Sequence, residues 1–308
     1  MRVALPTTLD EAVEALQDTP DAHLLAGGTD FCVEVNFGLR RPPAVVALRR
    51  VAELRMWQVQ GDRIVIGAGT TYADMLEHLR EEVPALAAAA RTVGSPQIRN
   101  AGTLGGNIAT ASPAGDTLPV LVALDAQVTL RGPSGVRSIA LRDLVVGVKR
   151  TAIEPGEVVT AVSFERPGGS QQFLKVGTRN AMVIAIASVA VVLDVGRRQV
   201  RCALGSVAPV PLRAVAAERH AVEELDWSRL AERRASGTRV SPGASSGRQA
   251  AEGRDAPFMT DSAIGRFGEL CALGCAPITD HRSTAEYRRR AVEVIAARAL
   301  RRCLHDIA

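Results

Sequence analysis

The sequence predicts a protein of mixed helices and strands that folds as two or three domains. Its 308 residues exceed the usual size of a single domain. Capping boxes of the form Ser/Thr-x-x-Asp/Glu mark the starts of helices, and short runs of β-branched residues between them favour strands. Hydrophobic residues make up 47% of the chain and aromatic residues only 3%, so the predicted core consists of Ala, Val and Leu.

The first predicted unit, residues 1–55, is a small β-α-β arrangement. A capping box at Thr8 begins a helix with apolar residues at helical spacing. Residues 23–26 form a short apolar run that predicts a strand, and residues 31–37 continue as a helix. A second strand is expected at residues 44–48, after two consecutive prolines.

The second predicted unit, residues 56–168, contains several strands and helices. Two strands, 56–60 and 63–67, are expected to pair across the tight turn Gly61-Asp62. Thr71 caps a helix that runs to about residue 80, and Ser112 is the expected N-cap of another. Further elements are a helix at 84–93 and strands at 126–131, 136–140 and 158–164.

The third predicted unit, residues 169–308, begins after Pro167-Gly168-Gly169. Strands are expected at 172–175, within the apolar run 183–195, and at 199–207. A capping box at Ser283 begins a long last helix with an apolar stripe formed by Tyr287, Ala291, Ile295, Ala299 and Cys303. Residues 234–257 are rich in Gly, Ser and Arg with almost no large apolar side chain, so we expect a flexible insertion there.

Charge and cysteine usage indicate a cytoplasmic protein without a nucleic-acid partner. The net charge is +4, and arginines gather near the C-terminus at Arg288, Arg289, Arg290, Arg298, Arg301 and Arg302. No aromatic platform accompanies them, so a solvated or partner-facing helix is favoured over a nucleic-acid surface. No apolar run is long enough for a membrane span, and the N-terminus lacks a signal-peptide pattern. Five scattered cysteines suit a reducing compartment.

Two glycine pairs carry the candidate chemistry. The first segment, residues 24–31, reads Leu-Leu-Ala-Gly-Gly-Thr-Asp-Phe, and the second segment, residues 103–116, begins Thr-Leu-Gly-Gly-Asn. Tandem glycines allow backbone N–H groups to approach an anionic ligand closely, and successive N–H groups can form a nest for its oxygens. The two segments could therefore hold a diphosphate, or they could be ordinary tight turns. Neither is the G-x-G-x-x-G fingerprint of a Rossmann site.

In their order and spacing, these segments resemble the two FAD-pyrophosphate loops of the FAD-binding (medium) subunits of molybdenum hydroxylases, such as xanthine dehydrogenase and carbon monoxide dehydrogenase. The resemblance covers most of the chain. It implies an α+β fold in which a two-part FAD-binding region of the PCMH or vanillyl-alcohol-oxidase type, residues 1–55 and 56–168, precedes an α+β C-terminal domain, residues 169–308. It also implies that FAD binds non-covalently to Leu24, Leu25, Ala26, Gly27, Gly28, Thr29, Asp30, Phe31, Thr103, Gly105, Gly106 and Asn107.

The resemblance places three further residues at the cofactor. Asp116 falls where relatives hold ribityl or ribose hydroxyls, with Ser112 nearby, although Asp116 could instead be a helix-start acid. Lys175 falls where relatives place a cofactor lysine, whose charge would stabilise the reduced flavin; an exposed strand lysine is the alternative. His23 precedes the first segment, and we interpret it as a strand residue rather than a point of covalent attachment.

As a member of this family, the chain would be one subunit of a larger oxidoreductase. The molybdopterin would lie on a large subunit and two [2Fe–2S] clusters on a small subunit, and FAD on this chain would pass electrons to NAD, a quinone or oxygen. Cys271 and Cys275 have no companion ligands for a cluster or metal site here. The alternatives are an independent flavin oxidase or reductase of the same fold, for which the sequence shows no acid–base constellation, and a cofactor-free binding module. Neither the substrate, the acceptor nor the oligomeric state is encoded in a recognisable pattern.

Overall fold

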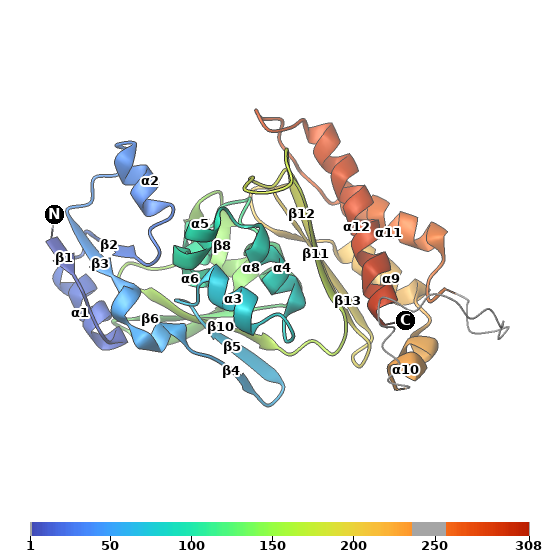
Figure 1. Cartoon of the computed structure of the whole chain (residues 1–308), viewed down its shortest axis with the longest axis horizontal. Coiled ribbons are helices and arrows are strands. Elements are labelled where there is room, and N and C mark those ends of the chain that lie inside the picture. Colours follow the sequence, from blue (N-terminus) through green and yellow to red (C-terminus); the bar gives the residue numbers. More distant parts are fainter. Residues whose placement is uncertain (1, 236–256, 308) are drawn as a thin grey trace.

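The computed structural model describes residues 2–235 and 257–307, and the three larger of the four sheets in these residues lie side by side along its long axis (Figure 1). Helices lie between the central and C-terminal sheets and over the outer face of the last sheet, and two more lie beside the N-terminal sheet. The predicted insertion, residues 234–257, lies outside the described residues except at its ends. In the described part, no helix combines the length and the apolar character needed to cross a bilayer.

The N-terminal sheet is parallel and small. Strands β1 (Arg2–Ala4), β3 (Ala44–Ala47) and β2 (Ala22–Leu25) lie in that order, and helices α1 (Leu9–Asp18) and α2 (Phe31–Asn36) connect them. Thr8 caps α1 as predicted, because its hydroxyl accepts the N–H of Glu11. The helix α1 buries Ala12, Val13 and Leu16 against this sheet, whereas α2 has no buried residue.

The central sheet is antiparallel with the strand order β4-β5-β10-β6-β7. The hairpin predicted across Gly61-Asp62 is confirmed, since β4 (Trp57–Gln60) pairs with β5 (Arg63–Gly67) and Gln60 faces Arg63. The remaining strands are β10 (Val158–Glu165), β6 (Gln127–Gly132) and β7 (Gly135–Ala140). Two 3₁₀ turns, η1 (Leu48–Arg50) and η2 (Ala52–Arg55), join the N-terminal sheet to β4.

Helices pack over the central sheet and fill the space beside it. They are α3 (Tyr72–His78), α4 (Pro84–Thr92), α5 (Pro96–Ala101), α6 (Leu104–Thr110), α7 (Thr117–Ala123) and α8 (Leu141–Leu144), followed by the ribbon of β8 (Val145–Gly147) and β9 (Arg150–Thr151). The capping box predicted at Thr71 is confirmed, with reciprocal hydrogen bonds between Thr71 and Asp74. Every residue of α7 is buried, so this helix lies in the middle of the molecule.

The C-terminal sheet has helices on both faces. Strands β11 (Gln171–Val176), β12 (Ala187–Asp194), β13 (Gln199–Gly205) and β14 (Leu212–Arg213) are antiparallel. One face packs on α9 (Val215–Glu224), α11 (Asp261–Leu273) and α12 (Ala285–Ile307), and the other packs on α4 and α7. The helix α10 (Trp227–Ala235) follows α9 and ends at the last described residue before the gap at 236–256. Burial on both faces explains the continuous apolar run of the sequence at β12.

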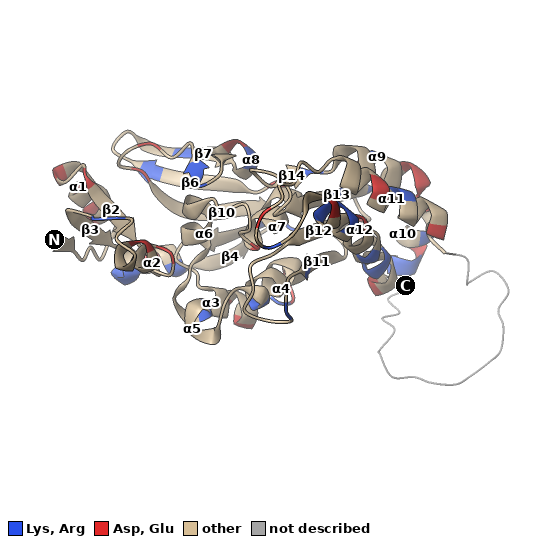
Figure 2. Ribbon diagram, turned by 90° about the horizontal axis from the view of Figure 1, so that it is seen from above, with Lys and Arg blue, Asp and Glu red and all other residues tan. Residues whose placement is uncertain are grey.

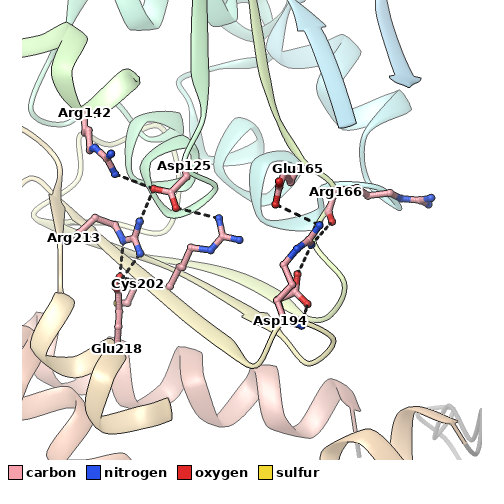
Figure 3. Close-up of polar contacts among 10 residues, drawn as sticks. Asp125, Arg142, Glu165, Arg166, Asp194, Cys202, Arg213 and Glu218 are labelled. Carbon is pink, nitrogen blue, oxygen red and sulfur yellow. Dashed lines mark hydrogen bonds and ion pairs between the residues drawn. The ribbon is translucent and has the colours of Figure 1, made fainter. Parts of the chain in front are cut away.

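Ion pairs connect the C-terminal sheet to the central region (Figure 3). Asp125, after α7, accepts hydrogen bonds from Arg142 and from Arg213 on β14, the latter at 2.7 Å. Arg213 also makes a bidentate contact with Glu218 on α9. The two regions therefore share charged contacts in addition to a packed apolar boundary.

The structure corrects four details of the last two predicted units. Ser112 is not a helix N-cap, because residues 112–116 form a turn and α7 begins at Thr117. Thr284, not Ser283, caps α12 by accepting the N–H of Tyr287. Tyr287 is exposed and lies off the apolar stripe, which is otherwise buried. Arg288 is not on the charged outer face of α12 seen in Figure 2 but is buried, where it donates to the carbonyl oxygens of Ile186 and Ser206.

Candidate functional site

A cleft of about 920 Å³ separates the N-terminal sheet from the helices of the central region. The first segment forms one wall, between β2 and α2, and the start of the second segment forms the facing wall. The side chains and backbone of β10 and of the β8–β9 ribbon complete the lining through Val159, Val158, Lys149 and Thr151. A concave site of this size between two layers of a fold is typical of a cofactor pocket.

The first segment offers unpaired backbone donors to this cleft. Gly28 has φ +73°, a left-handed conformation that glycine adopts without strain. Within the described residues, the N–H groups of Gly27, Gly28 and Thr29 donate to no protein acceptor. Consecutive free N–H groups at a left-handed turn form a nest for anionic oxygens. The turn therefore has the backbone conformation that such a nest requires, and the anion-binding role of this segment stays a prediction.

Gly27, the other glycine of this pair, is required for close packing rather than for a left-handed conformation. A Cβ at this position would lie 1.9 Å from the carbonyl oxygen of Ala101, at the end of α5. Only glycine allows the first segment to approach that backbone so closely. The contact fixes the distance between the two walls of the cleft.

The second segment is not the predicted N–H nest, because its glycines lie in the first turn of helix α6. The N–H of Gly105 donates to Ala68 O at 2.8 Å, and the N–H of Gly106 donates to the capping hydroxyl of Thr103 at 3.0 Å. A Cβ at Gly105 would lie 2.6 Å from the Cβ of Ala68. These glycines therefore permit close packing and leave a wall without side chains facing the cleft. Their N–H groups are hydrogen-bonded within the protein and are not free for a ligand.

Most of the predicted site residues line one cleft. The structure brings together Leu24, Leu25, Ala26, Gly27, Gly28, Thr29, Asp30, Phe31, Thr103, Gly105, Gly106 and Asn107. The amide oxygen of Asn107 accepts the Thr117 hydroxyl at 2.6 Å, so that oxygen is already engaged. Ser112, Asp116 and Lys175 do not line this cleft. Nothing in the sequence separates these three residues from the others, because spacing along the chain does not indicate how deeply a residue lies in the fold.

Asp116 and Lys175 instead meet in a buried ion pair between the central region and β11. The ammonium of Lys175 lies 2.5 Å from Asp116 Oδ2, and both side chains are less than a tenth exposed. Thr92, at the end of α4, donates its hydroxyl to the same oxygen at 2.9 Å. Asp116 Oδ1 is buried and has no partner within the described residues. Burial raises the pKa of the Asp116 carboxyl, and the charge and hydrogen bond of Lys175 offset only part of that rise.

Charged side chains surround the mouth of the cleft near the first segment. Arg40 contacts Glu34 at 2.8 Å and donates to Nδ1 of His23 at 3.0 Å. Burial and the charge of Arg40 lower the pKa of His23, so the imidazole there is a neutral acceptor. Lys149 contacts the other oxygen of Glu34 at 3.1 Å. The carboxylate of Asp30 lies in the first segment as well, and over the whole cleft lining four Arg or Lys side chains are matched by four Asp or Glu side chains, so the lining has no net charge.

Tyr72 is a cleft residue that sequence reasoning missed. It follows the capping Thr71, is buried, and lines the cleft. Its ring packs so closely on Gly102 that a Cβ there would lie 2.7 Å from Tyr72 Cε2. Burial raises the pKa of its hydroxyl, and the negative charges of Asp116 and Asp30 raise it further. The capping box located this helix, but no local signal indicates which of its residues faces the cleft.

The chemistry of the lining fits a dinucleotide with a diphosphate. The free N–H groups suit the phosphate oxygens, and the glycine walls permit close backbone approach. Aliphatic side chains such as Leu48, Val51, Leu54 and Ile153 supply the apolar surface that planar rings require. In the described part of the chain, no group of three or more His, Cys, Asp or Glu side chains is placed to hold a metal ion.

Comparisons with known proteins agree with this chemistry. Residues 1–166 match the family described as the FAD binding domain in molybdopterin dehydrogenase. The carbon monoxide dehydrogenase medium chain of Afipia carboxidovorans is 34% identical over 307 residues, 96% of this chain and 94% of that protein. The nicotinate dehydrogenase FAD-subunit of Eubacterium barkeri is 38% identical over 191 residues, 59% of this chain but only 64% of that protein. In the structure of reconstituted CO dehydrogenase from Oligotropha carboxidovorans, one chain superposes with a TM-score of 0.83 at 28% identity, covering 99% of this chain and 98% of its own.

Proposed function

The chain belongs to the FAD-binding (medium) subunits of molybdenum hydroxylases, and from that premise we propose that the cleft holds FAD non-covalently as an electron-transfer site. The observation that carries this proposal is that the N–H groups of Gly27, Gly28 and Thr29, three residues that line the cleft, donate to no protein acceptor within the described residues. These groups bind the diphosphate, and the Gly105-Gly106 wall leaves room for the rest of the cofactor. FAD, when bound, accepts electrons singly and releases them in pairs.

The protein supplies binding, orientation and exclusion of water around this group. Tyr72 and the aliphatic lining shield the interior of the cleft, and the hydrogen bond from Arg40 to His23 joins the chain after α2 to β2. Asp116 and Lys175 do not line the cleft, and we propose that their ion pair influences the site from the interior of the protein. Asp116 Oδ1 has no partner within the described residues, but neither Asp116 nor Ser112 lines the cleft, so we assign both a supporting role rather than direct contact with a hydroxyl of the cofactor. Lys175 tunes the site as one member of a nearly neutral pair rather than as an isolated charge.

The activity of the assembled enzyme requires other subunits. We place the molybdopterin on a large subunit and the [2Fe–2S] clusters on a small subunit, with NAD or a quinone as the final acceptor and the cytoplasm as the compartment. The support is the shared architecture with relatives described as medium chains or FAD subunits of dehydrogenases. The substrate class, whether purine, aldehyde or another, is decided by those other subunits.

A combined binding and assembly experiment tests the proposal. The purified chain is expected to contain one FAD per chain, releasable by acid without proteolysis. When the chain is produced together with the molybdopterin and iron–sulfur subunits, the three should co-purify, and a purine or aldehyde substrate should bleach the flavin only in the complex. Absence of FAD would refute the cofactor assignment. Bleaching in the isolated chain would instead show an independent flavoenzyme.

A further inference from the structure

Two cysteine thiols meet in the core of the C-terminal layer, outside the cleft. Cys202 on β13 and Cys271 on α11 are separated by 69 positions in the sequence, yet their sulfur atoms lie 3.7 Å apart. Both residues are completely buried. A disulfide bond is about 2.0 Å long, so each sulfur would have to move by roughly 0.8 Å to form one. Side-chain adjustments of this size are small compared with the movement of a strand or helix.

The other three cysteines do not share this arrangement. The thiol of Cys275 lies 3.4 Å from the carbonyl oxygen of Cys271, and the thiol of Cys303 lies 3.8 Å from that of Val191. Cys32 is exposed, on α2 at the opposite end of the molecule. All five cysteines lie in the described part of the chain, and only Cys202 and Cys271 bring two sulfurs into contact.

We propose that Cys202 and Cys271 form a redox-sensitive pair that hydrogen peroxide converts to a disulfide linking β13 to α11. The backbone near Cys202 is fixed, because its N–H donates to Glu218 Oε1 at 2.8 Å and Glu218 is held by Arg213 (Figure 3). Cys271 lies in the third turn of α11, whose N-terminus is capped by Thr260. Both sulfurs are therefore held by ordered elements that keep them in contact.

The two thiols have different parts in the oxidation. The contact with Cys271 and burial both raise the pKa of the Cys202 thiol, so we assign the first step to Cys271 and the second to Cys202. The Cys271 sulfur attacks one oxygen of the peroxide, the O–O bond breaks, the departing hydroxide takes up the proton of the Cys271 thiol and leaves as water, and Cys271 becomes a sulfenic acid. The Cys202 sulfur then displaces the sulfenic hydroxyl, which leaves as water with the proton of Cys202. Two electrons pass from the sulfurs to the peroxide, and two thiols and one peroxide give one disulfide and two waters.

The location of the pair determines what oxidation would change. The crosslink would enclose α9, α10 and most of α11, which stabilises the fold by restricting the unfolded chain. Because β13 and α11 lie far from α2 and α6 (Figure 1), FAD binding should not change. Since neither sulfur is exposed, the reaction requires local opening of α11 and should be much slower than modification of the exposed Cys32.

The test uses the whole chain with Cys32 first capped by iodoacetamide under native conditions. After peroxide treatment without denaturant, we expect unreduced peptide mapping to show Cys202 joined to Cys271. The thermal midpoint should rise by a few degrees and return on addition of dithiothreitol. Cys202→Ala should abolish the linked peptide and the thermal shift. Cys303→Ala is the matched control, because it removes an equally buried thiol that lacks a sulfur neighbour, and it should retain both.

The peptide map of the unsubstituted chain decides the outcome even if a variant does not fold. The proposal is overturned if Cys202 and Cys271 remain thiols under native oxidation, or if they become linked only after unfolding in urea. It is also overturned if the main disulfide joins Cys271 to Cys275.

Discussion

The two glycine segments have similar compositions but different structural roles. The first segment, residues 24–31, has no buried residue, and the N–H groups at its glycine turn have no protein acceptor within the described residues. The second segment, residues 103–116, buries Leu104, Gly105, Ile108 and Asp116, and its glycine N–H groups are hydrogen-bonded inside the fold. The first segment therefore presents donors to a ligand, and the second provides the rigid wall against which the ligand rests.

This difference shows that a glycine pair has no fixed function of its own. Gly28 requires a left-handed φ, whereas Gly105 lies in a helical turn and requires space against Ala68. Substitutions in the first segment should therefore reduce cofactor affinity more than stability. Substitutions in or behind the second should reduce stability first.

The largest expected effect comes from the ion pair behind the second segment. Lys175→Met leaves Asp116 buried without its counter-charge, which should lower the free energy of unfolding by about 3–5 kcal/mol. Urea denaturation followed by far-UV circular dichroism measures this loss. The folded fraction should retain FAD.

The double variant Asp116→Asn/Lys175→Met is the control for that prediction. It removes both charges while keeping similar volumes, so more than half of the lost stability should return. A stable Lys175→Met protein that fails to bind FAD would instead make Lys175 a direct cofactor contact, as the family resemblance implies.

The adjacent glycines of the second segment provide a matched pair of substitutions. In Gly105→Ala the new methyl would meet the Ala68 Cβ at 2.6 Å, and overpacking of this kind should cost about 1–3 kcal/mol. In Gly106→Ala the nearest atom is the Thr103 hydroxyl at 2.9 Å, and a gain in helix propensity of up to about 1 kcal/mol offsets that contact. The midpoint of thermal unfolding should therefore be lower for Gly105→Ala than for Gly106→Ala, although the two positions are adjacent. Equal losses would contradict the assignment of Gly105 to close packing.

A substitution in the first segment should lower the affinity for FAD. Gly28→Ala forces a side chain into φ +73°, which costs about 1–2 kcal/mol and favours a rearranged turn that no longer presents its N–H groups. We expect FAD affinity to fall about tenfold or more, equivalent to about 1.4 kcal/mol or more. The matched control is Gly61→Ala, because Gly61 in the β4–β5 turn has a φ of +59° and open space around it. Gly61→Ala should lose similar stability and bind FAD normally. A similar loss of FAD affinity in both variants would contradict the assignment of the first segment to FAD binding.

The sequence predicted local features well because their causes are local. The capping hydroxyls at Thr8 and Thr71 and the hairpin at Gly61-Asp62 depend on neighbours within a few residues. The first segment and the residues Thr103, Gly105, Gly106 and Asn107 of the second were recognised by resemblance, and the structure places them on one cleft, whereas Ser112 and Asp116 of the second segment lie outside it. The helical state of Gly105 was missed because it depends on contact with Ala68, which is distant in sequence.

Long-range pairing explains the other misses. Lys175 and Asp116 are 59 positions apart, and their opposite charges become partners only after β11 packs on α4 and α7. Cys202 and Cys271 likewise meet only when α11 covers the C-terminal sheet. No periodicity or spacing along the chain encodes such contacts.

The smallest expected effect concerns the cap of the second segment. Thr103→Ala removes the hydroxyl that accepts the N–H of Gly106, which should cost about 1 kcal/mol and leave one more donor near the cleft wall. Thr260→Ala removes an equivalent cap from α11, where the hydroxyl accepts the N–H of Ala263, and should cost about the same. If the second segment is only a scaffold, Thr103→Ala should change FAD affinity no more than threefold, as measured by flavin fluorescence titration, and Thr260→Ala should not change it. A loss of FAD affinity greater than tenfold in Thr103→Ala alone would show that the hydroxyl itself contacts the cofactor, and the division between donor segment and scaffold segment would then be wrong.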